Sequence, residues 1–252
     1  MDQTLITVGT AFLTTVATKG AEAPANTFNN IWAYVFGPID NYLIKKNAVN
    51  KQNLDNFLKD INNELSQVEA QNIQKPKTSI LGPALEASKY YIEEDEIRKL
   101  FAKVIAASFD SSKNSVLHHS FVEIIKQLSP LDAKIIKSLP EPFYLIACSV
   151  QLGSTKHAIV SGVVLNDEFS EINFDTAIST SNLSRLGLIE VNNNLGPVKI
   201  NASDEEIINR YKHTTHYMSA CSEYGSANID IFSQPGHITN LGLAFKEICC
   251  SD

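Results

Sequence analysis

The sequence predicts a mainly α protein of the α+β class, with an N-terminal helical region followed by a winged-helix-like C-terminal domain. Apolar residues recur at helical spacing through the region before Pro140. β-Branched and aromatic residues then dominate 143–150 and 158–165, on either side of Gly153, which is typical of two strands or buried short elements. Helix, glycine, short strand and turn follow one another between Phe174 and Pro197, and this order is typical of a winged helix.

Residues 1–75, the first of three predicted domains, begin with an apolar segment. Helical spacing predicts a short helix over Leu5–Val16, and a second apolar stretch, Phe28–Phe36, contains Trp32. We interpret both as core elements. Lys19 is the only cation before Lys45, and this scarcity favours core positions, because interfacial helices are rich in cations; a membrane-active role of residues 1–45 stays an alternative.

A long helix completes the first domain. Its apolar residues follow 4-3-4-3 spacing and form one stripe, which must be buried against another surface. The stripe consists of Leu54, Leu58, Ile61, Leu65 and Val68. Because the pattern holds for only about two heptads, we favour packing within the chain over a zipper dimer.

Residues 76–140 form a second predicted domain of four helices. Gly82 and Pro83 indicate a helix over Ala84–Ile92, with Pro83 in its first turn. The acidic run 93–96 indicates the solvated start of the next helix, where the helix dipole favours negative charge. A third helix is predicted over Ser120–Leu128, and a fourth follows from Ser129 to Leu139, where Pro140 and Pro142 stop it.

Residues 141–252 form the predicted winged-helix-like domain. Gly187 is expected to have a positive φ angle, because it must end the helix 174–186 sharply before the strand 188–191. Ser203 and Glu206 form a capping box for a helix that continues to about Met218. A last helix, 241–248, follows Thr239.

Composition indicates a soluble globular protein. The chain has 252 residues, of which 44% are hydrophobic and 19% charged, and its mean hydropathy is -0.08. The apolar stretch near the N-terminus is too short for a spanning helix, so no transmembrane helix is expected. The four cysteines, Cys148, Cys221, Cys249 and Cys250, contain no C-x-x-C pair, and we interpret them as reduced thiols of a cytoplasmic protein.

Common signatures for phosphate binding, hydrolysis and metal binding are missing from the sequence. We therefore predict no enzyme activity, no catalytic residue, no cofactor and no metal site. The best metal candidate is His213 and His216 with Cys221, which would share one face of a helix, and whether these residues bind a metal stays open. His118 and His119 precede an apolar helix, where we expect a contact at the helix start.

The charge pattern argues against a nucleic-acid partner. The formal net charge is -7, and 170–223 contains four basic and seven acidic residues. A recognition helix at 174–186 would offer only Asn182 and Arg185 as donors to bases. We therefore expect protein partners rather than DNA.

Several segments resemble the abortive-infection alpha family of bacterial proteins. They are 79–87, 90–94, 100–102, 121–133, 182–189 and 241–245, so the similarity spans roughly residues 40–250. Where the family usually has His-Pro-Ser-Phe, this chain has His118-His119-Ser120-Phe121. The family offers no established catalytic residues to transfer, and the matching positions are helix caps, helix faces and a turn glycine.

The resemblance implies a bacterial or prophage-encoded anti-phage protein of the abortive-infection type. We expect it to act through protein–protein contacts with a phage or host protein. A winged-helix DNA-binding regulator and a membrane-active effector using residues 1–45 stay as alternatives, and a homo-oligomer stays open.

Overall fold

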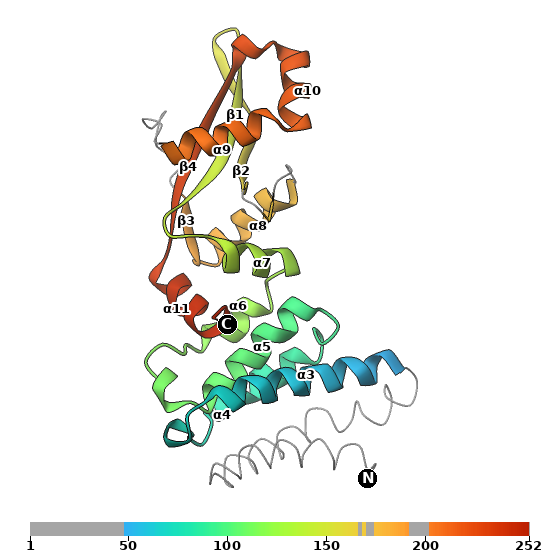
Figure 1. Cartoon of the computed structure of the whole chain (residues 1–252), viewed down its shortest axis with the longest axis vertical. Coiled ribbons are helices and arrows are strands. Elements are labelled where there is room, and N and C mark those ends of the chain that lie inside the picture. Colours follow the sequence, from blue (N-terminus) through green and yellow to red (C-terminus); the bar gives the residue numbers. More distant parts are fainter. Residues whose placement is uncertain (1–47, 166–167, 170–173, 192–201, 252) are drawn as a thin grey trace. The chain divides into compact units, whose positions relative to one another are not determined.

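The computed structural model describes residues 48–165, 168–169, 174–191 and 202–251 (Figure 1). The predicted helices at 5–16 and 28–36, with Trp32, and the turn 192–197 lie outside the described residues. The chain divides into two compact units, unit 1 (Met1–Pro130 with Ala244–Asp252) and unit 2 (Leu131–Leu243). The three-domain division at residues 75 and 140 stays a prediction.

Unit 1 is helical in its described part. It contains α3 (Ala48–Gln67), α4 (Thr78–Ser88), α5 (Asp95–Ser108), α6 (Ser120–Ile125), the end of α11 (Asn240–Cys249), and two single-turn helices, η2 (Ala70–Asn72) and η3 (Ser111–Lys113). Both α3 and α4 pack against α5. All five residues of the predicted stripe are buried, four on α3 and Val68 directly after it, so the predicted packing within the chain is confirmed.

The predicted start of α4 was wrong. The helix begins at Thr78, and Pro83 lies inside it rather than in its first turn. Ile80 and Leu81 are fully buried, and their burial outweighs the hydrogen bond that a proline removes from a helix interior. Pro83 itself is exposed, so its ring lies on the solvent side of the helix.

A buried arginine joins α3 to α5. Arg98 is 4% exposed, and its Nε donates to Asp60 Oδ2 of α3 at 2.8 Å. Its Nη1 donates to Asp95, in the first turn of α5. Burial lowers the pKa of Arg98, but hydrogen bonds with Asp60 and Asp95 outweigh burial and raise it above its ordinary value. The acidic run begins α5 as predicted.

Unit 2 combines helices with one antiparallel sheet of strand order β2-β1-β4-β3. The strands are β1 (Phe143–Leu152), β2 (Thr155–Val163), β3 (Ile189–Val191) and β4 (Ile229–Ile238). The helices are α7 (Pro130–Ser138), α8 (Phe174–Arg185), α9 (Ala202–Lys212), α10 (Thr215–Tyr224) and η4 (Ser226–Asn228). α8 packs on β2 and β3, and α9 packs on β1 and β4 (Figure 1).

The two predicted strands are confirmed; they pair as an antiparallel hairpin, with Gly153 at a φ angle of 62° between β1 and β2. A register shift interrupts this ladder between Ile146 and Cys148. The buried side chain of Gln234, on β4, reaches the shifted region, where its Oε1 accepts from Gly162 N at 3.0 Å. At the register shift, the N–H group of Gly162 therefore donates its hydrogen bond to a side chain.

Sequence reasoning missed β4, which pairs with both β1 and β3. Pro235 and Gly236 interrupt its sequence and argue against an inner strand. The last described pair with β3 is Val191 with Gly236, so Pro235 lies directly beyond the described ladder between β3 and β4.

One predicted helix is two helices in the structure. α9 ends at Lys212 and α10 begins at Thr215, whereas the sequence predicted a single helix to about Met218. Thr214 caps the second helix, since its side chain accepts from Tyr217 N at 3.3 Å. The hydrogen bond from Tyr217 N to the threonine side chain stabilises a new helix start, and it therefore favours two helices over one continuous helix.

The winged-helix assignment stays a prediction. The described residues contain its helix, glycine and strand in the predicted order. However, β3 pairs with β4, which follows two further helices, and the predicted turn lies outside the described residues.

Gly187 has a φ angle of 74°, as predicted from the sharp end of α8. We expect Gly187→Val to lower the free energy of unfolding by about 1 kcal/mol or more. A Cβ there would lie 3.8 Å from Leu241 Cδ2, an ordinary contact, so the cost comes from the backbone. Denaturant unfolding measures it, with Gly82→Ala as the control. Gly82 lies inside a helix with open space around it, and this substitution should stabilise.

The two carboxylates around Arg98 should contribute unequally. The Asp60 side chain is 21% exposed and that of Asp95 is 69% exposed. We expect Asp60→Ala to cost about 3 kcal/mol, because Arg98 would lose its buried partner, and Asp95→Ala to cost less than about 1 kcal/mol. Equal losses in urea unfolding would contradict this account of the cluster.

Candidate functional site

A hydrogen-bonded chain of three polar side chains joins α7 to α8. Asp132, on α7, is 3% exposed. Asn182 Nδ2 donates to Asp132 Oδ2 at 2.8 Å. Arg185 in turn donates to Asn182 Oδ1, from Nε at 3.1 Å and from Nη2 at 2.7 Å. We call Asp132, Asn182 and Arg185 the α7–α8 relay.

The relay fixes the direction of an exposed guanidinium. Asp132 accepts from the amide nitrogen of Asn182, so the amide oxygen must face Arg185. A guanidinium held in this way loses less side-chain entropy when it binds a carboxylate or phosphate. The relay joins a carboxylate, an amide and a guanidinium through hydrogen bonds, and these three groups do not pair a nucleophile with a base.

A second cluster of polar contacts lies where α8 ends and α11 begins. Thr239 N donates to Leu188 O at 3.0 Å, and Thr239 Oγ1 also donates to the carbonyl of Gly187. Gly242 N donates to Thr239 Oγ1 at 3.0 Å, so the Thr239 side chain caps the last helix. A Cβ at Gly242 would overlap the carbonyl of Leu188.

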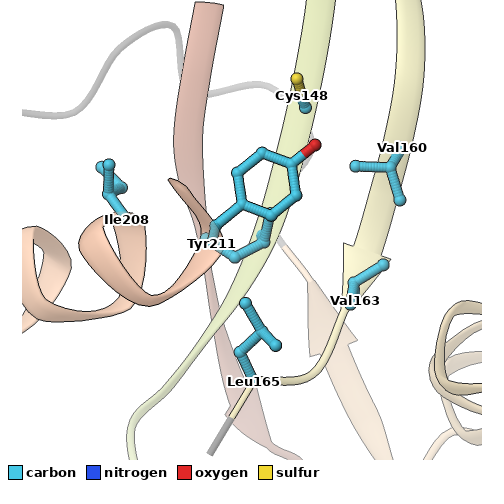
Figure 2. Close-up of a cluster of buried hydrophobic side chains, with 7 residues drawn as sticks. Cys148, Val160, Val163, Leu165, Ile208 and Tyr211 are labelled. Atoms are coloured by element: carbon cyan, nitrogen blue, oxygen red, sulfur yellow. The ribbon is translucent and has the colours of Figure 1, made fainter. Parts of the chain in front are cut away.

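The core of unit 2 holds a tyrosine beside a thiol and an imidazole. Tyr211, on α9, is fully buried, and Figure 2 shows its hydroxyl directed toward Cys148 of β1. The hydroxyl is 3.0 Å from His216 Nδ1. Burial raises the pKa of Tyr211 and of the Cys148 thiol, and it lowers the pKa of His216. A buried thiol with a raised pKa is a poor nucleophile.

The predicted metal candidates do not share a helix face. His213 follows the end of α9, whereas His216 lies in α10. His213 Nδ1 is 2.6 Å from Asn209 O, while His216 Nδ1 faces Tyr211. Spacing of three residues predicted a shared face, and this was wrong because Thr214 starts a new helix. In the part of the chain that the structure describes, no three His, Cys, Asp or Glu residues could hold a metal.

His118 makes the predicted contact at a helix start. Its Nδ1 accepts from Ser120 N at 3.1 Å and lies 2.8 Å from Ser120 Oγ. The following residue, Phe121, is fully buried and meets Phe245 of α11 edge to face, with ring centroids 5.5 Å apart. The imidazole therefore caps α6.

A family model, Abortive infection alpha, matches residues 49–249. The chain belongs to the abortive infection alpha family. No curated protein and no solved structure matches the chain closely enough to name a relative. Among the described helices, none combines the length and apolar character needed to cross a membrane.

The segments that resemble the abortive infection alpha family contact one another within each unit. In unit 1, Tyr91 OH donates to Lys126 O at 2.8 Å, which joins 90–94 to 121–133. In unit 2, Asp132 and Asn182 join 131–133 to 182–189. Gly242 lies close to the carbonyl of Leu188, and this contact joins 182–189 to 241–243. Family segments that are far apart in the sequence are therefore neighbours within each unit.

Sequence reasoning singled out Asn182 and Arg185 as candidate base contacts, and their partners in the relay were missed. The available signal was their spacing of three residues, which places both on neighbouring positions of one helix. Asp132 lies near the start of the fourth predicted helix, and no local pattern marks it as a partner of Asn182. Its contact with Asn182 crosses fifty positions of sequence.

His216 should make the stability of unit 2 depend on pH. Burial places its pKa below the ordinary 6.5, so below about pH 6.5 the unfolded chain binds a proton before the folded chain does. The free energy of unfolding should therefore fall as pH falls through this range. Urea unfolding at several pH values should show a shallower fall for His216→Asn, whose amide oxygen can still accept from Tyr211. His213→Asn, at an exposed position, is the matched control.

Proposed function

We propose that this protein acts in abortive-infection defence, in which an infected cell stops supporting phage propagation. The family match over residues 49–249 is the observation that carries this proposal. The family description indicates a role in defence, and it does not specify a chemical reaction.

We further propose that the protein acts through protein–protein contacts. The polar clusters in the described residues are occupied in capping helices and joining elements, as for His118, Asp132 and Thr239. The net charge of -7 disfavours a phosphate-rich partner. Surface contacts with another protein need neither a nucleophile nor a metal.

The geometry of α8 disfavours the alternative of a winged-helix DNA-binding regulator. A recognition helix needs several donors directed outward. Asn182 instead bonds to Asp132 and Arg185, and Ile178, at 68% exposure, occupies the outward face together with Arg185. The membrane-active alternative depends on residues 1–45, which lie outside the described residues.

Phage challenge of bacteria that express the chain tests the defence function. We expect fewer plaques than with an empty vector. At a high ratio of phage to cells, we expect the infected culture to stop growing without releasing a normal phage burst. Both results are needed, because plaque reduction with survival of infected cells would indicate a different type of defence.

A variant that cannot fold provides the control. Gly242→Val should collide with Leu188 and lose both stability and protection. Gly82→Ala, at a position with open space, should keep full protection. Equal plaque numbers with the wild-type chain and the empty vector, across a broad panel of phages, would contradict the proposal.

A further inference from the structure

The outer edge of β2 presents backbone hydrogen-bonding groups to solvent. In the described sheet, β2 is the end strand and pairs only with β1. Its first four residues, Thr155 to Ala158, are exposed. Farther along the strand, the carbonyl of Gly162 accepts from Thr180 Oγ1 of α8 at 2.7 Å. The free part of the edge is therefore the half of β2 nearest the hairpin turn.

The register of the hairpin determines which backbone groups face outward. Leu152 pairs with Thr155 across a two-residue loop, and the pair that closes such a loop exchanges both of its hydrogen bonds. Bonded and non-bonded pairs alternate along an antiparallel ladder, so Lys156 and Ala158 direct their N–H and C=O groups away from β1. His157, between them, bonds toward β1.

The charge that would protect this edge is directed away from it. Lysine side chains on edge strands commonly prevent pairing with another chain. Here Lys156 Nζ lies 2.6 Å from Asp230 Oδ2 on β4, and β1 lies between β2 and β4. The lysine side chain therefore extends across the sheet, and its charge is paired within its own chain.

From this arrangement, we propose that the free edge of β2 pairs with the β2 edge of a second copy of this chain, antiparallel and about a two-fold axis at His157. Lys156 of each copy then lies opposite Ala158 of the other, so the outward N–H and C=O groups of both residues bond reciprocally. Because the outward groups lie symmetrically on either side of one residue, the edge is complementary to itself, as a two-fold contact requires. The two sheets then form one continuous sheet.

The dimer should be weak and dependent on concentration. Stable interfaces bury about 1,200–2,000 Å² in total, and the short edge 155–159 offers less. This inference goes beyond the proposed function, and its measurement on purified protein does not depend on phage protection.

Disulfide trapping in the 252-residue chain tests the register. Residues opposite each other in a non-hydrogen-bonded pair have Cα atoms about 4.5 Å apart, within disulfide range. Oxidised glutathione is the oxidant and is reduced as each disulfide forms. We expect His157→Cys to give about fivefold more cross-linked dimer than Lys156→Cys or Ala158→Cys, because only residue 157 faces itself across the axis.

The two other cysteine variants are matched controls, since Lys156 and Ala158 are also exposed on the same strand. A mixture of these two variants should cross-link to each other, because position 156 of one copy faces position 158 of the second. The wild-type chain measures any cross-linking by its own four cysteines.

Ala158→Pro tests the backbone bonds. This substitution removes an N–H group that faces the second copy, whereas the ladder with β1 keeps its bonds. In analytical ultracentrifugation over a range of concentrations, we expect the dimer Kd to rise about tenfold or more. Ala158→Ser keeps the N–H group and should leave the Kd unchanged. Circular dichroism and thermal unfolding must show that each variant is folded.

A wild-type chain that stays monomeric at every concentration overturns the proposal. Cross-linking of His157→Cys no greater than that of its two controls, or an unchanged Kd for folded Ala158→Pro, also overturns it.

Discussion

The first turn of α11 lies directly against the carbonyl of Leu188, and this close approach requires a residue without a side chain at position 242. The same carbonyl accepts from Thr239 N, so the end of β4 and the start of β3 are joined at one point. Gly187, with its positive φ angle, turns the chain from α8 into this contact. The direction of α8 therefore depends on two glycines and one threonine.

Local sequence patterns predicted the positions of many helices and strands along the chain. Helix caps, prolines and periodic apolar residues influence the backbone within a few positions. The apolar stripe that begins at Leu54, the two strands around Gly153 and the end of α8 at Gly187 are of this kind. The errors arose where a distant contact decided the outcome. Burial of Ile80 and Leu81 extends α4 past a proline, and pairing with β1 forms β4 despite Pro235.

The candidate site was predictable only in part, for a related reason. Helical periodicity placed Asn182 and Arg185 on α8, but periodicity cannot reveal which residue of another helix will meet them. Asp132 and Asn182 are fifty positions apart, and their contact exists only once α7 and α8 pack in unit 2. For His213 and His216 the periodicity misled, because Thr214 ended one helix and started another.

Burial of a carboxylate such as Asp132 is costly unless its hydrogen bonds compensate, and an apolar residue of similar size would often stabilise a helix pair equally well. Asp132 is nevertheless 3% exposed and bonded to an amide that in turn holds Arg185 at the surface. The distinctive effect of this chain of polar side chains is to fix Arg185 on α8 through Asn182, from a carboxylate that lies on α7. Removal of Asp132 would therefore leave the Asn182 amide without its acceptor and free the amide to turn away from Arg185.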